Sequence, residues 1–168
     1  MQYLQRHILK RGWLIVAGML YSCGVSLHHS SNKYNTLHKN RPDIASLLKW
    51  PTDGIVTSYF GTRHGRPHEG IDISSKEGTP IYAAESGIVI FSGYHAHGYG
   101  NLIVIQHNEQ LVTVYAHNAK NLVQEKTHVK RGQLIAYVGQ TGRAAGAHVH
   151  FEVRDNKQPK NPLSYLPN

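Results

Sequence analysis

Several features are scarce in this 168-residue sequence, and each scarcity narrows the choice of fold. Cysteine occurs once, at Cys23, so an internal disulfide is excluded. The apolar run that ends before Ser22 is about ten residues long, whereas a bilayer span takes roughly twenty, so a permanent transmembrane helix is disfavoured. Helical periodicity is almost missing, which leaves little room for the crossover helices that a parallel sheet requires.

Acidic residues are also few. Ten Asp and Glu stand against eighteen Lys and Arg, which gives a formal net charge of +8. This balance suits an anionic partner such as a charged polymer. The basic residues are scattered rather than grouped, so no nucleic-acid binding is expected. The length fits one folded domain with a short extra segment.

The first 22 residues have the shape of a signal peptide. Arg6, Lys10 and Arg11 form a basic start, and a short apolar stretch follows. Removal of residues 1–22 would lower the formal charge from +8 to +5, because the segment holds those three cations and no acidic residue. The chain is therefore expected to be exported.

The stretch from Leu20 to Cys23 resembles the lipobox of bacterial lipoproteins, in which the cysteine is lipidated and becomes the mature N-terminus. A lipid on Cys23 would explain one unpaired cysteine in an exported chain. An ordinary signal peptide that happens to precede a cysteine is the alternative. Gly24 follows in place of Asp, and by the same resemblance this favours an outer-membrane lipoprotein that faces the periplasm, attached to the membrane through the lipid.

Residues 23–49 are rich in Ser, Asn, His and Lys and lack a sustained apolar period, so they are interpreted as a tether. A weak helical turn around Ile44 to Leu48 is the one regular feature considered there. A flexible chain of this length has a root-mean-square span of roughly 30 Å. Residues 50–168 are expected to form the domain.

The domain sequence predicts an all-β fold of short antiparallel strands in a sandwich or partly open barrel. Runs rich in β-branched and aromatic residues alternate with Gly, Pro, Asn and Lys. The predicted strands are Ile55–Phe60, Ile71–Ile73, Pro80–Ala84, Gly87–Ser92, Asn101–His107, Leu111–His117, Gln133–Gly139 and Ala147–Arg154.

Two histidine clusters could carry chemistry. In the first, His68 and Asp72 lie four residues apart across Gly70, which would let the backbone turn tightly. A surface histidine beside a turn-stabilising aspartate is the alternative interpretation. In the second, strand alternation puts His148 and His150 on one face together with Glu152. Solvent-facing histidines would explain that pattern equally well.

Together the clusters could form a catalytic zinc site, for which two histidines and one carboxylate are a known ligand set. His68, Asp72 and either His148 or His150 would bind the ion, and the remaining histidine would lie beside it. A neighbouring strand could deliver His117 to the same place. His95 and His97 share the two-residue spacing, but they lie in a stretch predicted to be a loop at the rim. His64, His107 and His128 are assigned surface or structural roles.

At this point the sequence resembles the lysostaphin-type, or LytM-like, zinc endopeptidases of bacterial cell walls, from about Trp50 to Pro167. The likeness rests on Ser58–Arg63 followed by His68–Asp72, on His148–Glu152, and on four segments between them. These are Gly78–Ala84, Gly98–Asn101, Tyr115–His117 and Val129–Gln133. The resemblance implies that one zinc ion is held by His68, Asp72 and His150, with His117 and His148 around the attacked carbonyl. Which histidine is the general base stays open.

The implied function is hydrolysis of the peptide cross-links of peptidoglycan. Asn118 and the approach Gly142–Ala147 depart from the usual family pattern, which leaves the substrate preference open. Asn118 and the C-terminal Asn161–Pro167 also resemble the NlpD-like lipoproteins, in which the same fold has lost metal-binding residues and activates wall amidases. A non-enzymatic activator with an amidase partner is therefore the alternative function. A purely wall-binding module is a third and weaker reading.

Overall fold

The computed structural model describes residues 48–63 and 65–168. The predicted signal peptide, Cys23, His64 and nearly all of the tether lie outside the described residues. Within the described part of the chain, no helix has the length and apolar character needed to cross a membrane.

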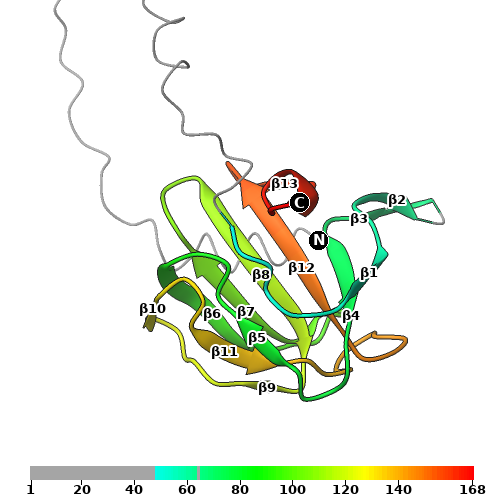
Figure 1. The fold of residues 1–168 in the computed structure, drawn as a ribbon, viewed down its shortest axis with the longest axis horizontal. Helices are drawn as coiled ribbons and strands as arrows, with labels where there is room; N and C mark the ends of the chain where they lie inside the picture. The colour runs from blue at the N-terminus through cyan, green and yellow to red at the C-terminus, as the bar shows by residue number, and fades with distance from the viewer. Residues whose placement is uncertain (1–47, 64) are drawn as a thin grey trace, which may run out of the picture. The chain divides into compact units, whose positions relative to one another are not determined.

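Most strands belong to one antiparallel sheet (Figure 1). Its spatial order is β1 (Ile55–Ser58), β4 (Ile71–Ser74), β12 (His148–Asp155), β8 (Leu111–Asn118), β7 (Gly100–Gln106), β6 (Gly87–His95) and β10 (His128–Val129), and β13 (Gln158–Lys160) pairs with β12. β12 therefore lies between β4, from the start of the domain, and β8, from its middle. The strand that is last but one in the sequence joins the two parts of the sheet.

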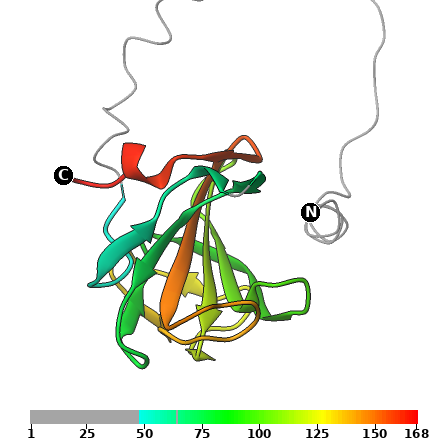
Figure 2. The same cartoon turned by 90° about the vertical axis from the view of Figure 1, so that its right-hand side faces the viewer.

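The remaining strands form two small sheets. β5 (Pro80–Tyr82), β11 (Leu134–Tyr137) and β9 (Lys120–Asn121) make a three-stranded sheet that lies against the large one (Figure 2). β2 (Gly61–Arg63) and β3 (Arg66–His68) form a separate hairpin, and a single 3₁₀ turn, η2 (Pro162–Ser164), follows β13. The described residues contain no α-helix, so the predicted all-β antiparallel fold is confirmed.

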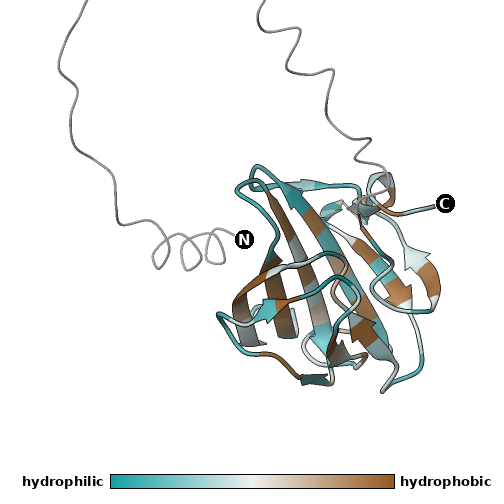
Figure 3. Ribbon diagram, turned by 60° about the vertical axis from the view of Figure 1, so that its left-hand side comes forward, coloured by the Kyte–Doolittle hydropathy of each residue, from teal (hydrophilic) through white to brown (hydrophobic). Residues whose placement is uncertain are grey.

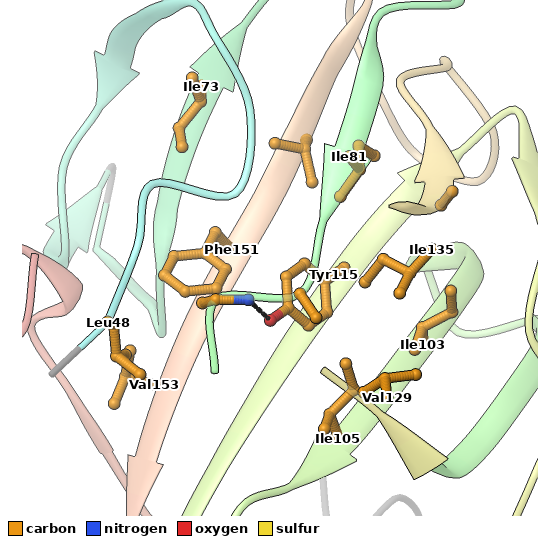
Figure 4. Packing of buried hydrophobic residues seen from close by; sticks show 14 of the residues in the cluster. Leu48, Ile73, Ile81, Ile103, Ile105, Tyr115, Val129, Ile135, Phe151 and Val153 are labelled. Carbon is orange, nitrogen blue, oxygen red and sulfur yellow. Dashed lines mark hydrogen bonds between the residues drawn. The ribbon is translucent and has the colours of Figure 1, made fainter. Parts of the chain in front are cut away.

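The main core lies between the large sheet and the three-stranded sheet. Phe151 and Tyr115 are paired across β12 and β8, and both pack with Ile103 of β7 against Ile81 and Ile135 of the small sheet (Figure 4). These side chains are fully buried. The alternation of apolar and polar bands along the strands is visible in Figure 3. Period-two alternation leaves the opposite face of β12 for polar groups.

The buried phenol of Tyr115 is satisfied by two donors. Its oxygen accepts hydrogen bonds from the backbone N–H of Ala84 at 2.9 Å and from the hydroxyl of Thr113 at 2.9 Å. The first of these connects the large sheet to the chain just after β5 (Figure 4). The polar atom thus helps to align the two layers of the core instead of weakening it.

All eight predicted strands occur, with ends that differ by a few residues. The strand β6 continues to His95, so the stretch from Gly93 to His95 is strand and not loop as predicted. Five further strands, each only two or three residues long, were not predicted: β2, β3, β9, β10 and β13.

Leu48 and Lys49, which the prediction assigns to the tether, contact the folded unit. Leu48 is completely buried in the core, and its N–H donates to the Tyr165 carbonyl at 3.2 Å. The Lys49 N–H donates to the Ala84 carbonyl at 2.9 Å. Leu48 and Lys49 therefore belong to the folded unit, although their neighbours in sequence are polar enough to resemble a tether.

Candidate metal centre

Three elements bring His68, Asp72 and His150 together on the polar face of the large sheet. His68 ends β3, Asp72 lies in β4, and His150 lies in β12. Asp72 and His150 are direct partners in the ladder between β4 and β12, although 78 residues separate them in sequence. One potential ligand atom from each residue lies within 4.8 Å of the others.

Gly70 is needed for this arrangement, but for a different reason from the one predicted. Its backbone does not turn through positive φ. A Cβ atom at this position would instead meet the Phe151 carbonyl oxygen at 2.3 Å. The glycine lets the chain between His68 and Asp72 lie directly against β12, which is how the first cluster reaches the second.

The three side chains converge on one point. His68 Nε2 lies 3.1 Å from Asp72 Oδ1, and His150 Nδ1 lies 2.9 Å from the same oxygen. The two ring nitrogens are themselves 3.1 Å apart. Asp72 and His150 are buried and His68 is nearly so. Two imidazole nitrogens and one carboxylate oxygen fit the protein donor set of a catalytic zinc ion.

Hydrogen bonds on the far side of each side chain fix which atom faces inward. His68 Nδ1 contacts the Tyr59 carbonyl at 2.8 Å, which assigns its proton to Nδ1 and leaves Nε2 free to coordinate. His150 Nε2 contacts Glu152 Oε1 at 3.1 Å, which assigns the inward role to Nδ1. Arg63 donates to Asp72 Oδ2 at 3.1 Å, so Oδ1 alone points to the centre. Such outer contacts are typical of metal ligands.

His117 and His148 lie beside this cluster. Their ring centroids are 4.7 Å apart, and the His117 ring is 6.1 Å from that of His150. His148 Nε2 lies 3.7 Å from Asp72 Oδ1. Each ring directs Nδ1 to a backbone carbonyl, His117 to Thr141 and His148 to Gly146, both at 2.8 Å. Both therefore present Nε2 inward.

The backbone of His117 is strained. Its φ of 65° lies in the left-handed region that non-glycine residues rarely adopt. The strain is held by two backbone contacts, since the N–H donates to the Tyr99 carbonyl at 2.9 Å and the carbonyl accepts from Thr141 N–H at 3.4 Å. Backbone strain of this kind concentrates at functional sites.

The electrostatics of the cluster are strongly coupled. Burial alone raises the pKa of Asp72, but its hydrogen bond to His150 and the nearby positive charges outweigh burial and hold that pKa well below its ordinary value. Burial lowers the pKa of His150, but hydrogen bonds to Asp72 and Glu152 raise it to about 9. For His117, burial and the neighbouring histidines lower the pKa to about 4, against the opposing hydrogen bond to Thr141.

The structure brings all five predicted site residues into one cluster, in which His150 lies closer to Asp72 Oδ1 than His148 does, at 2.9 against 3.7 Å. The other histidines within the described residues have other contacts or are exposed. His107 is held by the Ser86 carbonyl and the Thr113 hydroxyl at 2.9 and 2.8 Å. His128 is exposed on β10. The rings of His95 and His97 do approach each other, with centroids 5.5 Å apart, and His95 also contacts Tyr99.

Three residues at the site were missed as participants. Arg63 and Tyr99 were named only as parts of motif segments, and Glu152 only as part of a motif and for its face of the strand. The alternation from His150 to Glu152 was the usable signal for Glu152. No local signal indicated Tyr99, which lies 53 positions from its partner Glu152.

An antiparallel β domain with a His₂Asp cluster and two further histidines defines the class of this protein as a metallopeptidase-like β domain. The match of residues 66–162 to the model of peptidase family M23 identifies the family, and the chain belongs to it. This agrees with the predicted resemblance to LytM-like proteins.

Relatives of two kinds share this domain. The murein hydrolase activator NlpD of Escherichia coli K12 is 44% identical over 122 residues, which cover 73% of this chain and 32% of NlpD. Outer membrane antigenic lipoprotein B of Haemophilus influenzae is 40% identical over 143 residues, or 82% of this chain and 35% of that protein. The chain thus spans about a third of the length of these relatives.

A solved structure supports the same family. The zinc containing peptidase from Vibrio cholerae is 39% identical, with a TM-score of 0.64, over 68% of this chain and 38% of that chain.

Proposed function

We propose that this protein is a zinc-dependent endopeptidase that hydrolyses the peptide cross-links of bacterial peptidoglycan. The observation that carries the proposal is the complete cluster: His68, Asp72 and His150 direct one donor atom each to a common point. The likeness to a zinc containing peptidase supports zinc as the ion. The proposed ligands are these three residues, with one ion per domain.

The chain's own residues account for substrate activation. A bound zinc ion supplies Lewis-acid polarisation of a carbonyl and activation of water. With a pKa lowered to about 4, His117 is neutral at neutral pH, and because its Nδ1 donates to the Thr141 carbonyl, its Nε2 has the free lone pair that can accept a proton. His148 Nε2 faces the same space from the other strand and can donate to an oxyanion or a leaving nitrogen. The assignment of base and acid between the two histidines is part of the proposal.

The cellular setting is proposed from the N-terminal sequence and the relatives. Relatives named as lipoproteins support a lipid on Cys23, with residues 1–22 removed and residues 23–47 as a tether. The name of the Haemophilus influenzae relative supports the outer membrane, and periplasmic peptidoglycan would then lie within reach of the domain.

The test uses purified protein without residues 1–22, loaded with zinc or treated with a chelator, and isolated peptidoglycan. Release of fragments cut within peptide cross-links, resolved by mass, is expected only with zinc. His68→Ala and Asp72→Ala should abolish both zinc retention and release, because each removes one of only three protein ligands. His128→Ala is the matched control, since this exposed histidine lies outside the cluster. Cleavage by the chelated protein or by His68→Ala would refute the metal assignment.

A second candidate function is activation of a wall amidase without hydrolysis by this protein. The specific observation in its favour is the 44% identity to a protein named murein hydrolase activator. The five intact site residues argue against it. The same assay separates the two functions, because an activator would release amidase products only after an amidase is added, and His68→Ala would leave that effect intact.

A further inference from the structure

Glu152 is completely buried although it carries a carboxylate, and it lies directly behind the proposed metal ligand His150. We propose that Glu152 is a positioning residue, which holds the His150 ring so that Nδ1 and not Nε2 faces His68 and Asp72. This inference rests on the proposed metal centre, which it deepens. Neither the resemblance nor the family match assigns a role to this carboxylate.

Both oxygens of Glu152 are fully occupied. Oε1 lies 3.1 Å from His150 Nε2 and also accepts the Tyr99 hydroxyl at 2.7 Å. Oε2 accepts from Arg154 Nε at 2.7 Å. Side chains of three different residues donate to the two oxygens, so the carboxylate cannot rotate without breaking at least one of these hydrogen bonds. A neutral imidazole donates from one nitrogen and accepts at the other, so a fixed acceptor at Nε2 defines Nδ1 as the coordinating atom.

The network continues from Glu152 to the other side of the centre. Arg154 Nη2 donates to Glu69 Oε2 at 2.7 Å, and Glu69 is the residue after His68. Tyr99 holds Glu152 through its hydroxyl and His117 through its carbonyl. The buried carboxylate therefore connects the segments that carry His150, His68 and His117.

A purely stabilising ion pair between Glu152 and Arg154 is the competing explanation. Buried ion pairs contribute little net stability, because desolvation offsets their attraction, and apolar residues could fill the space equally well. A stabilising pair also gives no reason for Oε1 to contact His150. The two explanations differ in what happens to the ring of His150 when the carboxylate is replaced.

Glu152→Gln separates them while keeping the shape of the side chain. If the amide oxygen of the Glu152→Gln variant faces His150, the amide N–H groups face the N–H of Arg154 Nε. Two donors then oppose each other and no hydrogen bond forms there. The reversed amide is expected, because its oxygen still accepts from Arg154 Nε, and its N–H groups then point at Nε2 and favour the wrong ring nitrogen. Tyr99→Phe is a milder variant that removes one donor to Oε1. Tyr115→Phe is the matched control, because it also removes a buried phenol hydroxyl but lies in the opposite core.

Two measurements are made on each folded variant. The His150 ring N–H is followed by ¹⁵N-edited NMR in the metal-free protein, where a hydrogen-bonded Nε2 proton, slow to exchange, is expected in the wild type and lost in Glu152→Gln. Zinc affinity is measured by competition with a chromophoric chelator, and a decrease of about 10- to 100-fold is expected for Glu152→Gln. For Tyr99→Phe the zinc affinity is expected to fall about fivefold. For Tyr115→Phe it is expected to stay within about twofold of the wild-type value.

The proposal is overturned if the Nε2 proton of Glu152→Gln is unchanged, even with weaker zinc binding, since lost charge alone would then explain the affinity. It is also overturned if Tyr115→Phe weakens zinc binding as much as Tyr99→Phe does. If Glu152→Gln does not fold, Tyr99→Phe decides by the same two measurements. A wild-type protein that binds no zinc would refute the proposed function, and the ring proton would still decide the role of Glu152.

Discussion

His150 is the residue at which the proton and the proposed metal compete. Its ring lies between two carboxylates, and their hydrogen bonds raise its pKa to about 9 despite burial. In the metal-free protein at neutral pH, the ring is therefore charged and donates from both nitrogens, to Asp72 and to Glu152. A metal ion must displace the proton on Nδ1 before it can bind there.

Zinc binding should therefore release close to one proton from His150 at pH 7.5, and the affinity should rise by about tenfold per pH unit between pH 7 and 9. Calorimetry in buffers with different ionisation enthalpies measures the proton count. The exposed His128→Ala variant should behave as the wild type. Binding without proton release at pH 7.5 would contradict the shifted pKa of His150.

The raised pKa of His150 also makes the stability of the metal-free protein depend on pH. The pKa of His150 in the folded protein lies above its unfolded value of 6.5, so the charged ring stabilises the folded state. This stabilisation is complete below about pH 6.5 and is lost as the pH rises through about 9. The loss should amount to about 3 to 4 kcal/mol, from a shift of between two and three pH units. Urea unfolding of the metal-free protein at pH 6, 7.5 and 9 measures it. His150→Asn should remove this part of the pH dependence.

At the scale of elements, the turn between β6 and β7 is the segment that the sequence described least well. It was predicted as a loop at the rim, but its backbone contacts the segment from Thr141 to Arg143, and the Tyr99 carbonyl accepts from the His117 N–H at 2.9 Å. Gly100 has a φ of 65°, and a Cβ atom there would meet Thr141 Oγ1 at 2.4 Å. The Gly98 carbonyl accepts from the Arg143 N–H at 2.8 Å. The turn is thus a support for the chain that carries His117.

Gly100→Ala should destabilise the fold by about 2 kcal/mol or more, because it adds a backbone clash to an unfavourable φ. Thermal and urea unfolding measure the change. Gly146→Ala is the matched control, since this glycine precedes the site in the neighbouring loop, has no positive φ, and leaves open space around an added Cβ. Equal effects of the two substitutions would show that the turn is not held as the structure describes it.

Elements with a repeated pattern could be predicted, and those without one could not. The alternation from His148 to Val153 defined β12, its two faces and the candidate histidines together, because a period of two needs only local sequence. β9 and β10 have two residues each, too few for any period, and exist only because β11 and β6 offer partners. Tyr99 and Arg63 reach the site through tertiary contacts that local patterns do not encode. The same holds for Leu48, whose burial depends on the far end of the chain.

At the scale of the molecule, the N-terminal edge of the domain is closed by the C-terminal segment. Leu48 packs into the main core, and Trp50 Nε1 donates to the Pro167 carbonyl at 3.0 Å. Residues more than a hundred positions apart thus complete one edge. A domain trimmed at residue 50 would leave the site of Leu48 empty.

Leu48→Ala should lower the free energy of unfolding by about 2 to 5 kcal/mol, the usual cost of a cavity left by a buried leucine. Chemical denaturation of the wild type and the variant measures the difference. Ile55→Ala provides the control, because Ile55 is apolar but 75% exposed, and it should change stability by less than about 0.5 kcal/mol. A similarly small effect of Leu48→Ala would place residue 48 in the tether after all.

Zinc should stabilise the folded domain, because its three proposed ligands come from β3, β4 and β12. They lie close together only when these strands are folded side by side. At a free zinc concentration about 100 times the dissociation constant, the gain is about 2.7 kcal/mol. Differential scanning calorimetry with and without chelator measures it. Asp72→Ala should show no zinc-dependent shift, and a shift in that variant would point to binding elsewhere.

The place of β12 between β4 and β8 sets the order in which the molecule becomes complete. During synthesis His68 and Asp72 are made early and His150 about 80 residues later, so β4 can pair with β1 but lacks its other neighbour until β12 has been made. A nascent or truncated chain without β12 therefore holds two of the three proposed zinc ligands. The strand order therefore delays assembly of the proposed zinc site until β12 has been made. A hydrolase of the proposed kind would be inactive before that point in its synthesis.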